Sequence, residues 1–341
     1  MILVTGATGL VGSHLLYQIC RTEDKIRATK RERSNLALVK KVFSYYTAHS
    51  EKLFNKIEWA DADLLNICEL EPTFQGITKV YHCAAWVSFN PKHKHQMIQN
   101  NVESTANIVN LCLANKVHKL CHVSSVAAIG RAGNSNIINE ETPWLDGPEN
   151  SNYAISKYNS ELEVWRGIEE GLNAVIVNPT IILGPGEWKK GSSVIFHQVW
   201  KGMPFYTTGT NGFVDVRDVA NVMIQLMESK VSSKRFILGS ESIPLKQTFD
   251  YIAVAMGKKK ANIKAGPILN AIGWRLAKLF SFFTRKAPML TKETAQAGNN
   301  TSIYENDKIK KALNFEFIPV EQSCNDFSKL YLKDKSLITN D

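Results

Sequence analysis

The sequence predicts an α/β protein: a doubly wound parallel sheet with helices on both faces, and a smaller, mostly helical C-terminal lobe. Two observations carry this prediction. Short apolar segments alternate with segments of helical periodicity through the first 180 residues. Beyond that point the alternation stops, and glycine and proline recur between residues 184 and 212. Strands that alternate with helices form parallel sheets covered on both faces, whereas repeated glycine and proline indicate loops.

Six apolar segments in the first part are expected to be strands, with helices between them. The predicted strands cover residues 1–5, 26–30, 57–63, 79–85, 119–124 and 174–178, and the main helices cover residues 10–21, 97–115 and 153–170. A helix at 216–228 and a strand at 235–238 are expected to rejoin the sheet. The chain from Ile243 is expected to be mainly helical and to end in a polar tail. Right-handed crossovers then wind the sheet in both directions.

The composition excludes several classes of protein. The 341 residues are 44% hydrophobic and 21% charged, which is ordinary for a soluble domain. The net charge of +9 is spread along the chain, so solvated surface is expected and a nucleic-acid partner is not. None of the six cysteines has C-x-x-C or zinc-ligand spacing, so we expect no metal site and reduced thiols in a cytoplasmic protein. Neither a signal peptide nor a membrane span of about 20 residues is expected.

Residues 5–12, TGATGLVG, form a G-x-x-G-x-x-G motif between the first strand and the first helix. Glycines there allow a tight turn, close approach of a pyrophosphate and close packing of helix on strand. The helix N-terminus offers unpaired N–H groups to the phosphates. The motif therefore predicts a Rossmann-type dinucleotide site, and the expected cofactor contacts are Gly6, Thr8, Gly9, Leu10 and Val11. Residues 1–180, completed by about 213–240, are assigned to this domain, and residues 181–212 and 241–341 to the substrate-binding lobe.

The end of the second strand favours NADP(H) over the alternative, NAD(H). NAD-binding proteins usually place an acidic residue there for the ribose, but this strand ends in Lys30 and Arg31, with Arg33 close behind. Cations at this place attract a 2′-phosphate. Solvated cations, with Glu32 serving the ribose, remain the alternative. Asp63, followed by Leu64, is placed either to contact the adenine or to cap a turn.

A Y-x-x-x-K motif places Tyr153 and Lys157 on one face of a helix. A free tyrosine has a pKa near ~10, and an ammonium group one turn away lowers it toward useful acid–base chemistry. A strand ending at Ser124 and Ser125 supplies a hydroxyl that could stabilise charge on a substrate oxygen.

These motifs, in this order, resemble the extended branch of the short-chain dehydrogenase/reductase superfamily, the NAD-dependent epimerase/dehydratase family. The matching segments are TGATGLVGSHLL, HCAAWVSF, HVSSVAAIG, YAISK, NPTIILGPG, FVDVRDVA and YENDKIKKALNFEFIP. The nearest likeness is to the dihydroflavonol reductase and 3β-hydroxysteroid dehydrogenase group, whose second strand is similar to IRATKR. That group's corresponding arginine meets the 2′-phosphate, which points to Arg31.

The resemblance implies a Ser–Tyr–Lys triad of Ser125, Tyr153 and Lys157. The family's serine lies five residues before a glycine, which selects Ser125 from Gly130 and leaves Ser124 as the fallback and as a cofactor contact. Further residues are implied to lie at the cofactor. They are Ala84 and Ala85 along it, Asn101 just before a helix that steadies the site, and Asn178 and Pro179 beside the nicotinamide, with Tyr153 and Lys157 also touching it.

Three functions are compatible with these residues. The leading one is an NADP(H)-dependent oxidoreductase that reduces a ketone or aldehyde of a relatively apolar small molecule, or oxidises a secondary alcohol. The first alternative is a nucleotide-sugar epimerase or dehydratase with tightly bound NAD. Such enzymes usually carry an Arg-Asp pair where this chain has Asn211 and Gly212. The second alternative is a non-catalytic NADP-sensing protein, which an intact triad disfavours.

Two expectations concern partners. Residues 268–283, ILNAIGWRLAKLFSFF, are strongly apolar and are compatible with a lid helix, a subunit interface or a peripheral membrane contact. A core or lid helix of the smaller lobe is favoured, and an apolar lid suits an apolar ketone. The family resemblance further implies a homodimer that pairs the helices near 97–115 and 153–170 of two subunits.

Overall fold

The computed structural model describes residues 1–339, apart from residues 89, 132–134, 149 and 267–297. The apolar stretch 268–283 lies outside this described part. Among the described residues, no helix is both long and apolar enough to cross a membrane.

Seven parallel strands form the central sheet, in the order β3-β2-β1-β4-β5-β7-β11. They are β1 (Ile2–Thr5), β2 (Ile26–Lys30), β3 (Ile57–Asp61), β4 (Lys79–His82), β5 (Lys119–Val123), β7 (Ala174–Pro179) and β11 (Lys234–Leu238). The chain winds outward from β1 first through β2 and β3 and then, on the other side, through β4 and β5. This order confirms the predicted doubly wound fold and places the switch point between β1 and β4.

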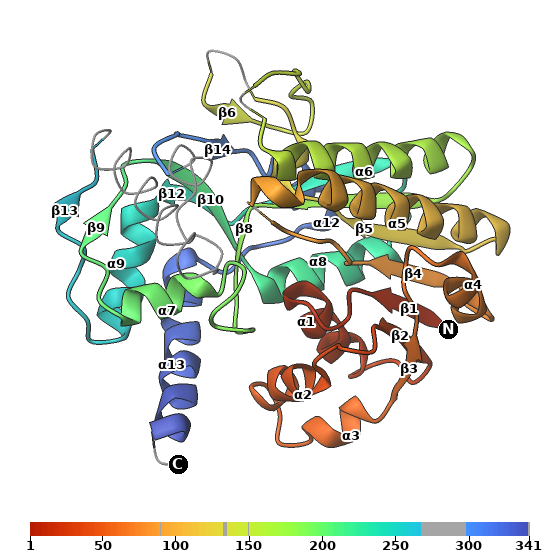
Figure 1. Cartoon of the computed structure of the whole chain (residues 1–341), viewed down its shortest axis with the longest axis horizontal. Coiled ribbons are helices and arrows are strands. Elements are labelled where there is room, and N and C mark those ends of the chain that lie inside the picture. The colour runs from red at the N-terminus through yellow and green to blue at the C-terminus, as the bar shows by residue number, and fades with distance from the viewer. Residues whose placement is uncertain (89, 132–134, 149, 267–297, 340–341) are drawn as a thin grey trace.

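Helices cover both faces of the central sheet (Figure 1). α1 (Leu10–Ile19) and α8 (Val216–Glu228) lie on one face, and α5 (Lys94–Ala114) and α6 (Asn152–Glu169) lie on the other. Successive strand residues point to opposite faces. Val4 and Cys121 therefore join the core under α1 and α8, whereas Leu3 and Leu120 join the core under α5 and α6.

Shorter elements complete this part of the chain. They are α2 (Leu36–Ser44), α3 (Ser50–Phe54), α4 (Ile67–Leu70) and 3₁₀ turns at Glu71–Phe74, Pro91–His93 and Val126–Ala128. The predicted strands 57–63, 79–85 and 119–124 end earlier, at Asp61, His82 and Val123. The residues beyond these points leave the ladder to form the loops at the carboxyl edge of the sheet.

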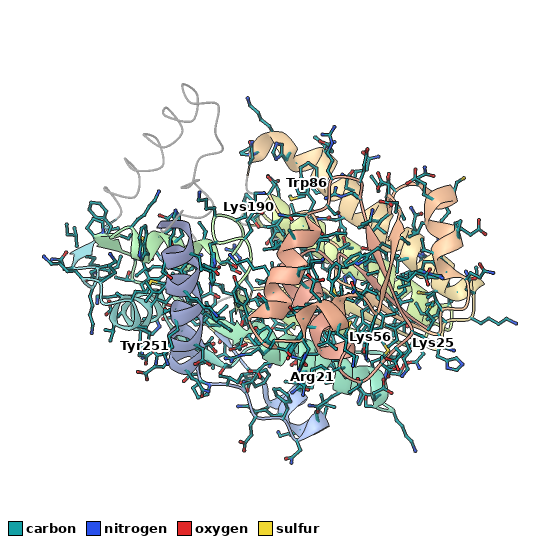
Figure 2. The ribbon with its side chains drawn as sticks, turned by 90° about the horizontal axis from the view of Figure 1, so that it is seen from below. Arg21, Lys25, Lys56, Trp86, Lys190 and Tyr251 are labelled. Carbon is teal, nitrogen blue, oxygen red and sulfur yellow. The ribbon has the colours of Figure 1, made fainter. Side chains whose placement is uncertain are left out.

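A second part of the chain packs beside the sheet and has its own apolar core. It contains the three-stranded sheet of β8 (Ile181–Leu183), β10 (Thr210–Asp215) and β12 (Glu241–Pro244), with helices α7 (Val194–Trp200), α9 (Leu245–Ala255) and α13 (Val320–Thr339). The helix α12 (Asp307–Leu313) instead packs against β11 and α8, and its Ile309 belongs to the core of the central sheet, although the sequence assigned it to the substrate-binding lobe. Two short strand pairs join distant segments, β9 (Phe205–Tyr206) with β13 (Ile263–Lys264) and β6 (Ile137–Ile138) with β14 (Ile303–Tyr304). Figure 2 shows Tyr251 on this side and Lys25 and Lys56 at the far end, beside the central sheet.

The predicted polar tail is wrong, because the last described segment is the helix α13. Its apolar residues recur at helical spacing, so Val320, Cys324, Phe327 and Tyr331 share one buried face. Because the residues between them are polar, the composition of this segment does not indicate a buried face. α13 packs against α9 and helps to close the core of the second part.

Candidate active site

The carboxyl ends of β1, β4, β5 and β7 meet at one edge of the sheet, where open α/β sheets bind their ligands. β1 leads into Gly6, β4 leads toward Ala84, and β5 leads directly into Ser124. The sequence predicted cofactor or catalytic contacts in each of these loops. The structure therefore brings the predicted segments together at the switch point.

Two glycines of the first loop occupy places that no side chain could share. Gly6 has a φ of +65°, and a Cβ atom there would lie 2.5 Å from the backbone nitrogen of Ala84. A Cβ atom on Gly12 would lie 2.3 Å from the carbonyl oxygen of Gly6. The loop thus turns tightly against the β4 loop and lets α1 start directly above it. This shape fits the backbone approach that a pyrophosphate needs.

The N-terminus of α1 is open to an anion. Gly9 is its N-cap residue, no described side chain caps it, and the first turn holds no acidic residue. Its unpaired N–H groups and partial positive charge favour a phosphate. The predicted contacts Gly6, Thr8, Gly9, Leu10 and Val11 all surround this end. The residues present therefore fit the diphosphate of a dinucleotide.

A loop from the second part of the chain lies over the same helix end. A Cβ atom on Gly184 would come within 3.3 Å of Leu10 Cδ1, and one on Gly186 within 3.2 Å. Ser193 Oγ donates to the carbonyl oxygen of Gly184 at 2.8 Å, which holds the loop to the start of the α7 segment. The segment 184–186 therefore packs against Leu10 at the start of α1.

The two cations predicted to choose the cofactor have different surroundings. Lys30 pairs with Asp61 on the neighbouring strand, directly opposite in register. Arg31 is exposed, and its backbone N–H donates to Ser34 Oγ at 2.9 Å in the turn before α2. The charge of Lys30 is thus already balanced, and the guanidinium of Arg31 faces solvent beside it.

Asp63 caps a turn, which was one of its two predicted roles. Its Oδ1 accepts from the backbone N–H of Leu65 at 3.1 Å, while its own N–H donates to Glu69 Oε2 at 2.9 Å. The side chain remains exposed, and Leu64 beside it is half-buried. The structure thus shows the turn-capping role, and the adenine contact stays a prediction.

Asn101 ties the loop after β4 to the helix α6. Its Oδ1 accepts from the N–H of Trp86 at 2.7 Å, and its Nδ2 donates to the Trp86 carbonyl at 2.9 Å and to Ser156 Oγ at 2.7 Å. The residue lies inside α5, so the prediction that it precedes this helix is wrong. Its helical position is what aims the side chain at Ser156. Ala84 and Ala85 belong to the loop that these contacts hold.

Ser125 and Tyr153 are joined by a side-chain hydrogen bond. Ser151 Oγ accepts from the N–H of Ala154 at 3.1 Å and so starts α6 with Tyr153 in its first turn. Ser125 Oγ also accepts from the N–H of Ala127 at 3.1 Å, which orients it at the end of β5. Local capping on both sides thus sets the pair.

Lys157 lies one turn after Tyr153 and is 2% exposed. Its Nζ donates to the carbonyl oxygen of Val123 at 2.9 Å. Burial lowers the pKa of the ammonium to about 8, and the carboxylate of Glu161 works in the opposite direction. Burial raises the pKa of the Tyr153 phenol above its usual value, and the hydrogen bond with Ser125 only partly offsets this, so the net direction is opposite to the lowering predicted from the sequence. At neutral pH the phenol therefore holds its proton and Lys157 is charged.

Ser124 and Ser125 point to different partners. Ser124 Oγ donates to Glu161 Oε2 at 2.6 Å in the buried layer beneath α6. Of the two serines considered from the sequence, the structure brings Ser125 to Tyr153 and engages Ser124 with the carboxylate. Asn178, at the end of β7, donates from Nδ2 to the Ser125 carbonyl at 3.0 Å. Pro179 follows it and is buried.

Sequence reasoning missed Glu161 and Arg235. Glu161 is 2% exposed, and its Oε1 accepts from Arg235 Nη1 at 3.1 Å. A signal was present, because Glu161 continues the spacing of Tyr153 and Lys157 by one more turn on the same face. A carboxylate on the buried stripe of a helix needs partners, which could have marked it. Nothing in the sequence near Arg235 pointed to the pairing.

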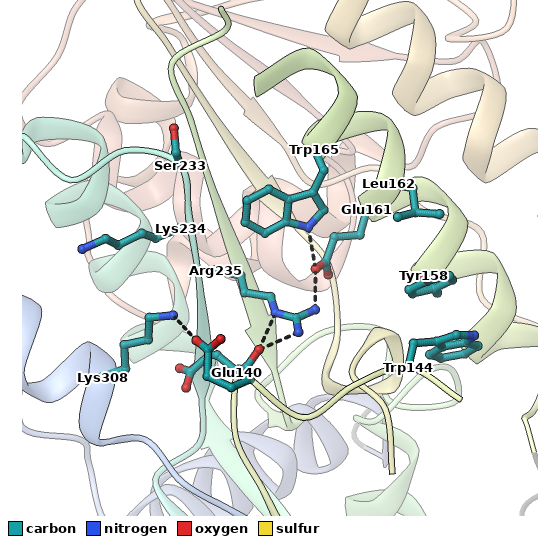
Figure 3. Close-up of a pocket in the computed structure, with 11 residues that line it drawn as sticks. Glu140, Trp144, Tyr158, Glu161, Leu162, Trp165, Ser233, Lys234, Arg235 and Lys308 are labelled. Atoms are coloured by element: carbon teal, nitrogen blue, oxygen red, sulfur yellow. Dashed lines mark hydrogen bonds and ion pairs between the residues drawn. The ribbon is translucent and has the colours of Figure 1, made fainter. Parts of the chain in front are cut away.

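A cavity of about 470 Å³ opens on the other side of Glu161 (Figure 3). In the figure, Arg235 reaches from β11 toward both Glu161 and Glu140, and Trp165 points its indole nitrogen at Glu161. The rings of Trp144 and Tyr158 stack at the far wall, 4.2 Å apart. Glu161 therefore separates this cavity from the serines of β5.

Comparison with known proteins gives the same picture. The family described as "NAD dependent epimerase/dehydratase family" matches residues 2–239. The chain is 29% identical over 261 residues to a putative dihydroflavonol 4-reductase of Synechocystis, covering 74% of this chain and 72% of that protein. It is 26% identical over 271 residues to sterol demethylase protein B of Methylococcus capsulatus, covering 78% of each. The crystal structure of gox2253 superposes with a TM-score of 0.78 and 28% identity over 98% of both chains. The phosphate loop, the switch-point site and these matches together establish that the chain belongs to the NAD-dependent epimerase/dehydratase family of extended short-chain dehydrogenases/reductases.

Proposed function

We propose that the protein is an NADP(H)-dependent oxidoreductase that reduces a ketone or aldehyde of a relatively apolar small molecule, or oxidises the corresponding alcohol. The observation that carries this proposal is the hydrogen-bonded pair of Ser125 and Tyr153, with the buried ammonium of Lys157 one turn below. The pair lies at the edge of the sheet that also holds the open phosphate loop. The chain is similarly identical in sequence to two relatives with different names, a putative dihydroflavonol 4-reductase (29%) and sterol demethylase protein B (26%). We therefore propose a class of substrate and no single compound.

In the proposed reduction, Tyr153 gives its phenolic proton to the substrate oxygen. The Ser125 hydroxyl donates a hydrogen bond to the same oxygen and stabilises the charge that develops there. Burial supports this direction, because the raised pKa of Tyr153 keeps the proton available at neutral pH. In the oxidation, the proton returns from the alcohol to Tyr153. The cofactor, when bound, accepts or supplies the hydride.

Lys157 stabilises the tyrosinate that the proton transfer leaves behind. An ammonium favours a neighbouring anion by Coulomb attraction, and its effect is large where water is excluded. The contact from Lys157 Nζ to the Val123 carbonyl fixes its position relative to β5. Proton transfer is therefore expected to depend on the charge of Lys157, which is lost above a pH of about 8.

The proposed cofactor contacts are the glycine loop, the end of β2 and the carboxyl ends of the central strands. Arg31 is assigned to the 2′-phosphate because it is exposed at the end of β2. Asn178 Oδ1 is buried and has no hydrogen-bond partner among the described residues, so it suits an amide N–H of the nicotinamide. We assign Ala84, Ala85, Asn101, Ser124 and Pro179 to the cofactor as well, since they lie on or beside the loops at this edge of the sheet.

The epimerase or dehydratase alternative is disfavoured by the packing at Gly212. A Cβ atom there would lie 2.5 Å from Thr180 Cγ2 and 2.8 Å from the Tyr304 ring. Asn211 turns its Oδ1 back to the N–H of Gly212 at 2.8 Å. The place of the usual Arg-Asp pair thus has no room for a side chain at Gly212. A purely NADP-sensing protein is disfavoured by the hydrogen-bonded Ser125 and Tyr153, which such a protein would not need.

The test is a panel assay that follows NADPH absorbance. The panel contains a dihydroflavonol, an aryl ketone, a 3-ketosteroid, an aliphatic aldehyde and UDP- and dTDP-glucose. We expect oxidation of NADPH with at least one apolar carbonyl compound. Tyr153→Phe should abolish that turnover while NADPH still binds, because the ring remains and only the proton donor is lost.

Tyr158→Phe is the matched control, since Tyr158 lies on the same helix but lines the cavity beyond Glu161. Its turnover should match that of the wild type. Normal turnover by Tyr153→Phe would remove Tyr153 from the mechanism. Conversion of a nucleotide sugar alone would overturn the substrate class and restore the epimerase alternative.

We also propose a cytoplasmic location. All six cysteines are free, and reducing compartments keep thiols in that state. Fractionation of expressing cells tests this, and recovery in a secreted fraction would contradict it.

A further inference from the structure

The carboxylate of Glu161 is buried under α6 and accepts four hydrogen bonds. Its Oε2 accepts from Ser124 Oγ at 2.6 Å and from Asn178 Nδ2 at 2.8 Å. Its Oε1 accepts from Arg235 Nη1 at 3.1 Å and from Trp165 Nε1 at 3.2 Å. Each oxygen thus has two donors. A buried carboxylate is stable only with such partners, because desolvation penalises its charge.

The two oxygens face different parts of the molecule. Oε2 faces the ends of β5 and β7, where Ser124 and Asn178 lie. Oε1 faces the cavity, where Figure 3 shows the Arg235 guanidinium and the Trp165 indole converging on it. Arg235 also donates to the Glu140 carbonyl at 2.9 Å, which anchors the segment after Ser125 to the edge strand β11. Glu161 therefore links the site to the outer frame of the sheet.

Three consecutive residues at the end of β5 are held by this arrangement. The carbonyl of Val123 accepts from Lys157, the hydroxyl of Ser124 donates to Glu161, and the carbonyl of Ser125 accepts from Asn178. Asn178 is in turn held by Glu161 through the same Nδ2 atom. Glu161 thus acts on both sides of the Ser124–Ser125 peptide without touching the Ser125 side chain.

We propose that Glu161 is a positioning residue for the reaction: its carboxylate fixes the backbone that presents Ser125 to the substrate oxygen and supplies the negative charge that balances Lys157. This inference rests on the function proposed above, because it assigns Glu161 to the same serine and lysine. Arg235 and Trp165 orient the carboxylate from the opposite side. Nothing reacts at Glu161 itself.

Lys157 is surrounded by titratable groups on its own helix and on the strands beneath it. Glu161, on its own helix, and Cys83, after β4, raise the pKa of Lys157 against the effect of burial. The imidazoles of His82 on β4 and His122 on β5 are buried, and their pKa values are lowered both by burial and by Lys157. Both histidines and the Cys83 thiol are therefore neutral near pH 7, since burial raises the pKa of the thiol well above its usual value. Glu161 is the charged partner within this set.

The experiment removes the negative charge of the Glu161 side chain without changing the size of that side chain. In Glu161→Gln, the amide NH₂ group replaces one carboxylate oxygen, so the two donors that faced that oxygen would meet N–H groups and lose their acceptor. We expect kcat to fall roughly 10- to 100-fold, as for a small misplacement of a catalytic group. KM for the carbonyl compound with the highest rate in the panel should change little, because Glu161 lies behind the site. The alkaline limb of the kcat profile should move to lower pH, since Lys157 loses the charge that favours its protonation.

Glu161→Asp separates the two effects. It keeps the charge but shortens the reach by one methylene, so kcat should fall while the alkaline limb stays in place. Glu163→Gln is the matched control, because Glu163 lies on the same helix and pairs with Arg166 at the surface at 2.9 Å. That variant should keep both the kcat and the pH profile of the wild type.

Each outcome supports or overturns the inference. Wild-type kcat and an unmoved alkaline limb in a folded Glu161→Gln protein would overturn it. If that variant fails to fold, wild-type kcat in Glu161→Asp would overturn it instead. Tyr153→Phe distinguishes this failure from failure of the proposed function. An inactive Tyr153→Phe with normal Glu161 variants rejects the positioning role alone, whereas an active Tyr153→Phe rejects the proposed reaction.

Discussion

Lys30 and Arg31 are adjacent in the sequence, yet their side chains have different surroundings. Lys30 ends β2 and pairs with Asp61, which ends β3. Arg31 has left the ladder, and its side chain is exposed at the start of the next turn. A surface pair such as Lys30–Asp61 adds little stability, but it neutralises the lysine locally. Of these two residues, Arg31 is therefore the one that we propose for a 2′-phosphate.

Replacing Arg31 by Ala should weaken NADPH binding roughly 10- to 100-fold, since a charge-assisted contact to phosphate is worth about 1.5–3 kcal/mol. NADH has no 2′-phosphate, so its affinity should not change. Fluorescence titration of both cofactors measures the two dissociation constants. Arg21→Ala is the control, because Arg21 follows the opposite end of α1. An equal loss for NADPH and NADH would contradict the assignment of Arg31.

At this scale the sequence predicts some residues well and others poorly, for physical reasons. Tyr153 and Lys157 could be placed from helical spacing alone, because i and i+4 always share a face. Ser124 and Ser125 are neighbours on one strand end, so only the structure shows which hydroxyl meets Tyr153. Glu161 was missed because a glutamate on a helix is usually solvated, and its partner Arg235 is 74 residues away.

Among the elements, α8 and the segment before α13 are joined by one buried carboxylate. Asp218, in the first turn of α8, is 4% exposed, and its Oδ2 accepts from the N–H of Ile318 at 2.8 Å. Burial raises the pKa of this carboxyl to about 7. Asp218 lies in the segment FVDVRDVA, where a structural role was favoured from the sequence, and the structure shows it holding two elements together.

The raised pKa makes the stability depend on pH in a defined direction. In the unfolded chain Asp218 ionises near its ordinary pKa of ~3.9, so the folded state binds the proton more tightly. Its contribution is therefore complete below pH 4 and is lost as the pH rises to about 7. Asn cannot ionise, and its amide oxygen can still accept from Ile318. Asp218→Asn should thus gain stability over the wild type between pH 5 and 8, by at most about 4 kcal/mol.

Thermal unfolding of both proteins across this pH range measures the difference. Asp24→Asn is the control, because the Asp24 side chain is 84% exposed in its pair with Lys56 and should alter stability little. A constant gap between wild type and Asp218→Asn from pH 5 to pH 8 would show that the carboxyl does not titrate there.

The elements themselves were predictable to different degrees. β1, β5 and β7 stand out because they are buried on both faces and are largely apolar, whereas β2 and β3 carry charged and partly exposed residues. The helical character of the chain after Ile243 was predicted, but the bounds and the buried face of α13 were not. Its apolar residues are isolated among polar ones, and only the lobe that it covers reveals the stripe. The pairing of β6 with β14 joins residues 137–138 to 303–304, and no local pattern encodes a contact over that separation.

The whole molecule consists of the central seven-stranded sheet with its helices and of a second part with its own core, and we propose the boundary between them. β11 joins the central sheet and α8 packs on one face of it, as predicted for the segment completing the first domain. β10, which leads directly into α8, instead pairs with β8 and β12. The chain therefore passes from the second part to the central sheet at Asp215. The predicted boundary assigned residues 213–215 to the nucleotide-binding domain, but these residues pair with β8 and β12 in the second part.

We predict that the molecule is a homodimer formed through α5 and α6, as its family resemblance implies. These helices pack together on one face of the sheet (Figure 1), and Leu162 on α6 is 45% exposed. Sedimentation equilibrium should give twice the chain mass of 38.2 kDa. Leu162→Lys should weaken the dimer, because a charge would have to be buried.

Val254→Lys is the matched control for this substitution. Val254 is 61% exposed on α9, in the other part of the chain, and should leave the mass unchanged. A monomeric wild type at micromolar concentration would contradict the prediction. A dimer that both substitutions leave intact would place the interface elsewhere.

Asp334, near the end of α13, has a consequence for the order in which the protein matures on the ribosome. Its buried carboxylate accepts from Tyr45 at the end of α2 and from Trp188 in the loop after β8, each at 2.6 Å, and pairs with Lys41. Tyr45 emerges 289 residues before Asp334 during synthesis. The first βα units can therefore collapse early, but their outer helix obtains this anchor only when translation has passed residue 334. Until Asp334 has been synthesised, Tyr45 and Trp188 both lack the carboxylate that accepts their hydrogen bonds in the folded protein.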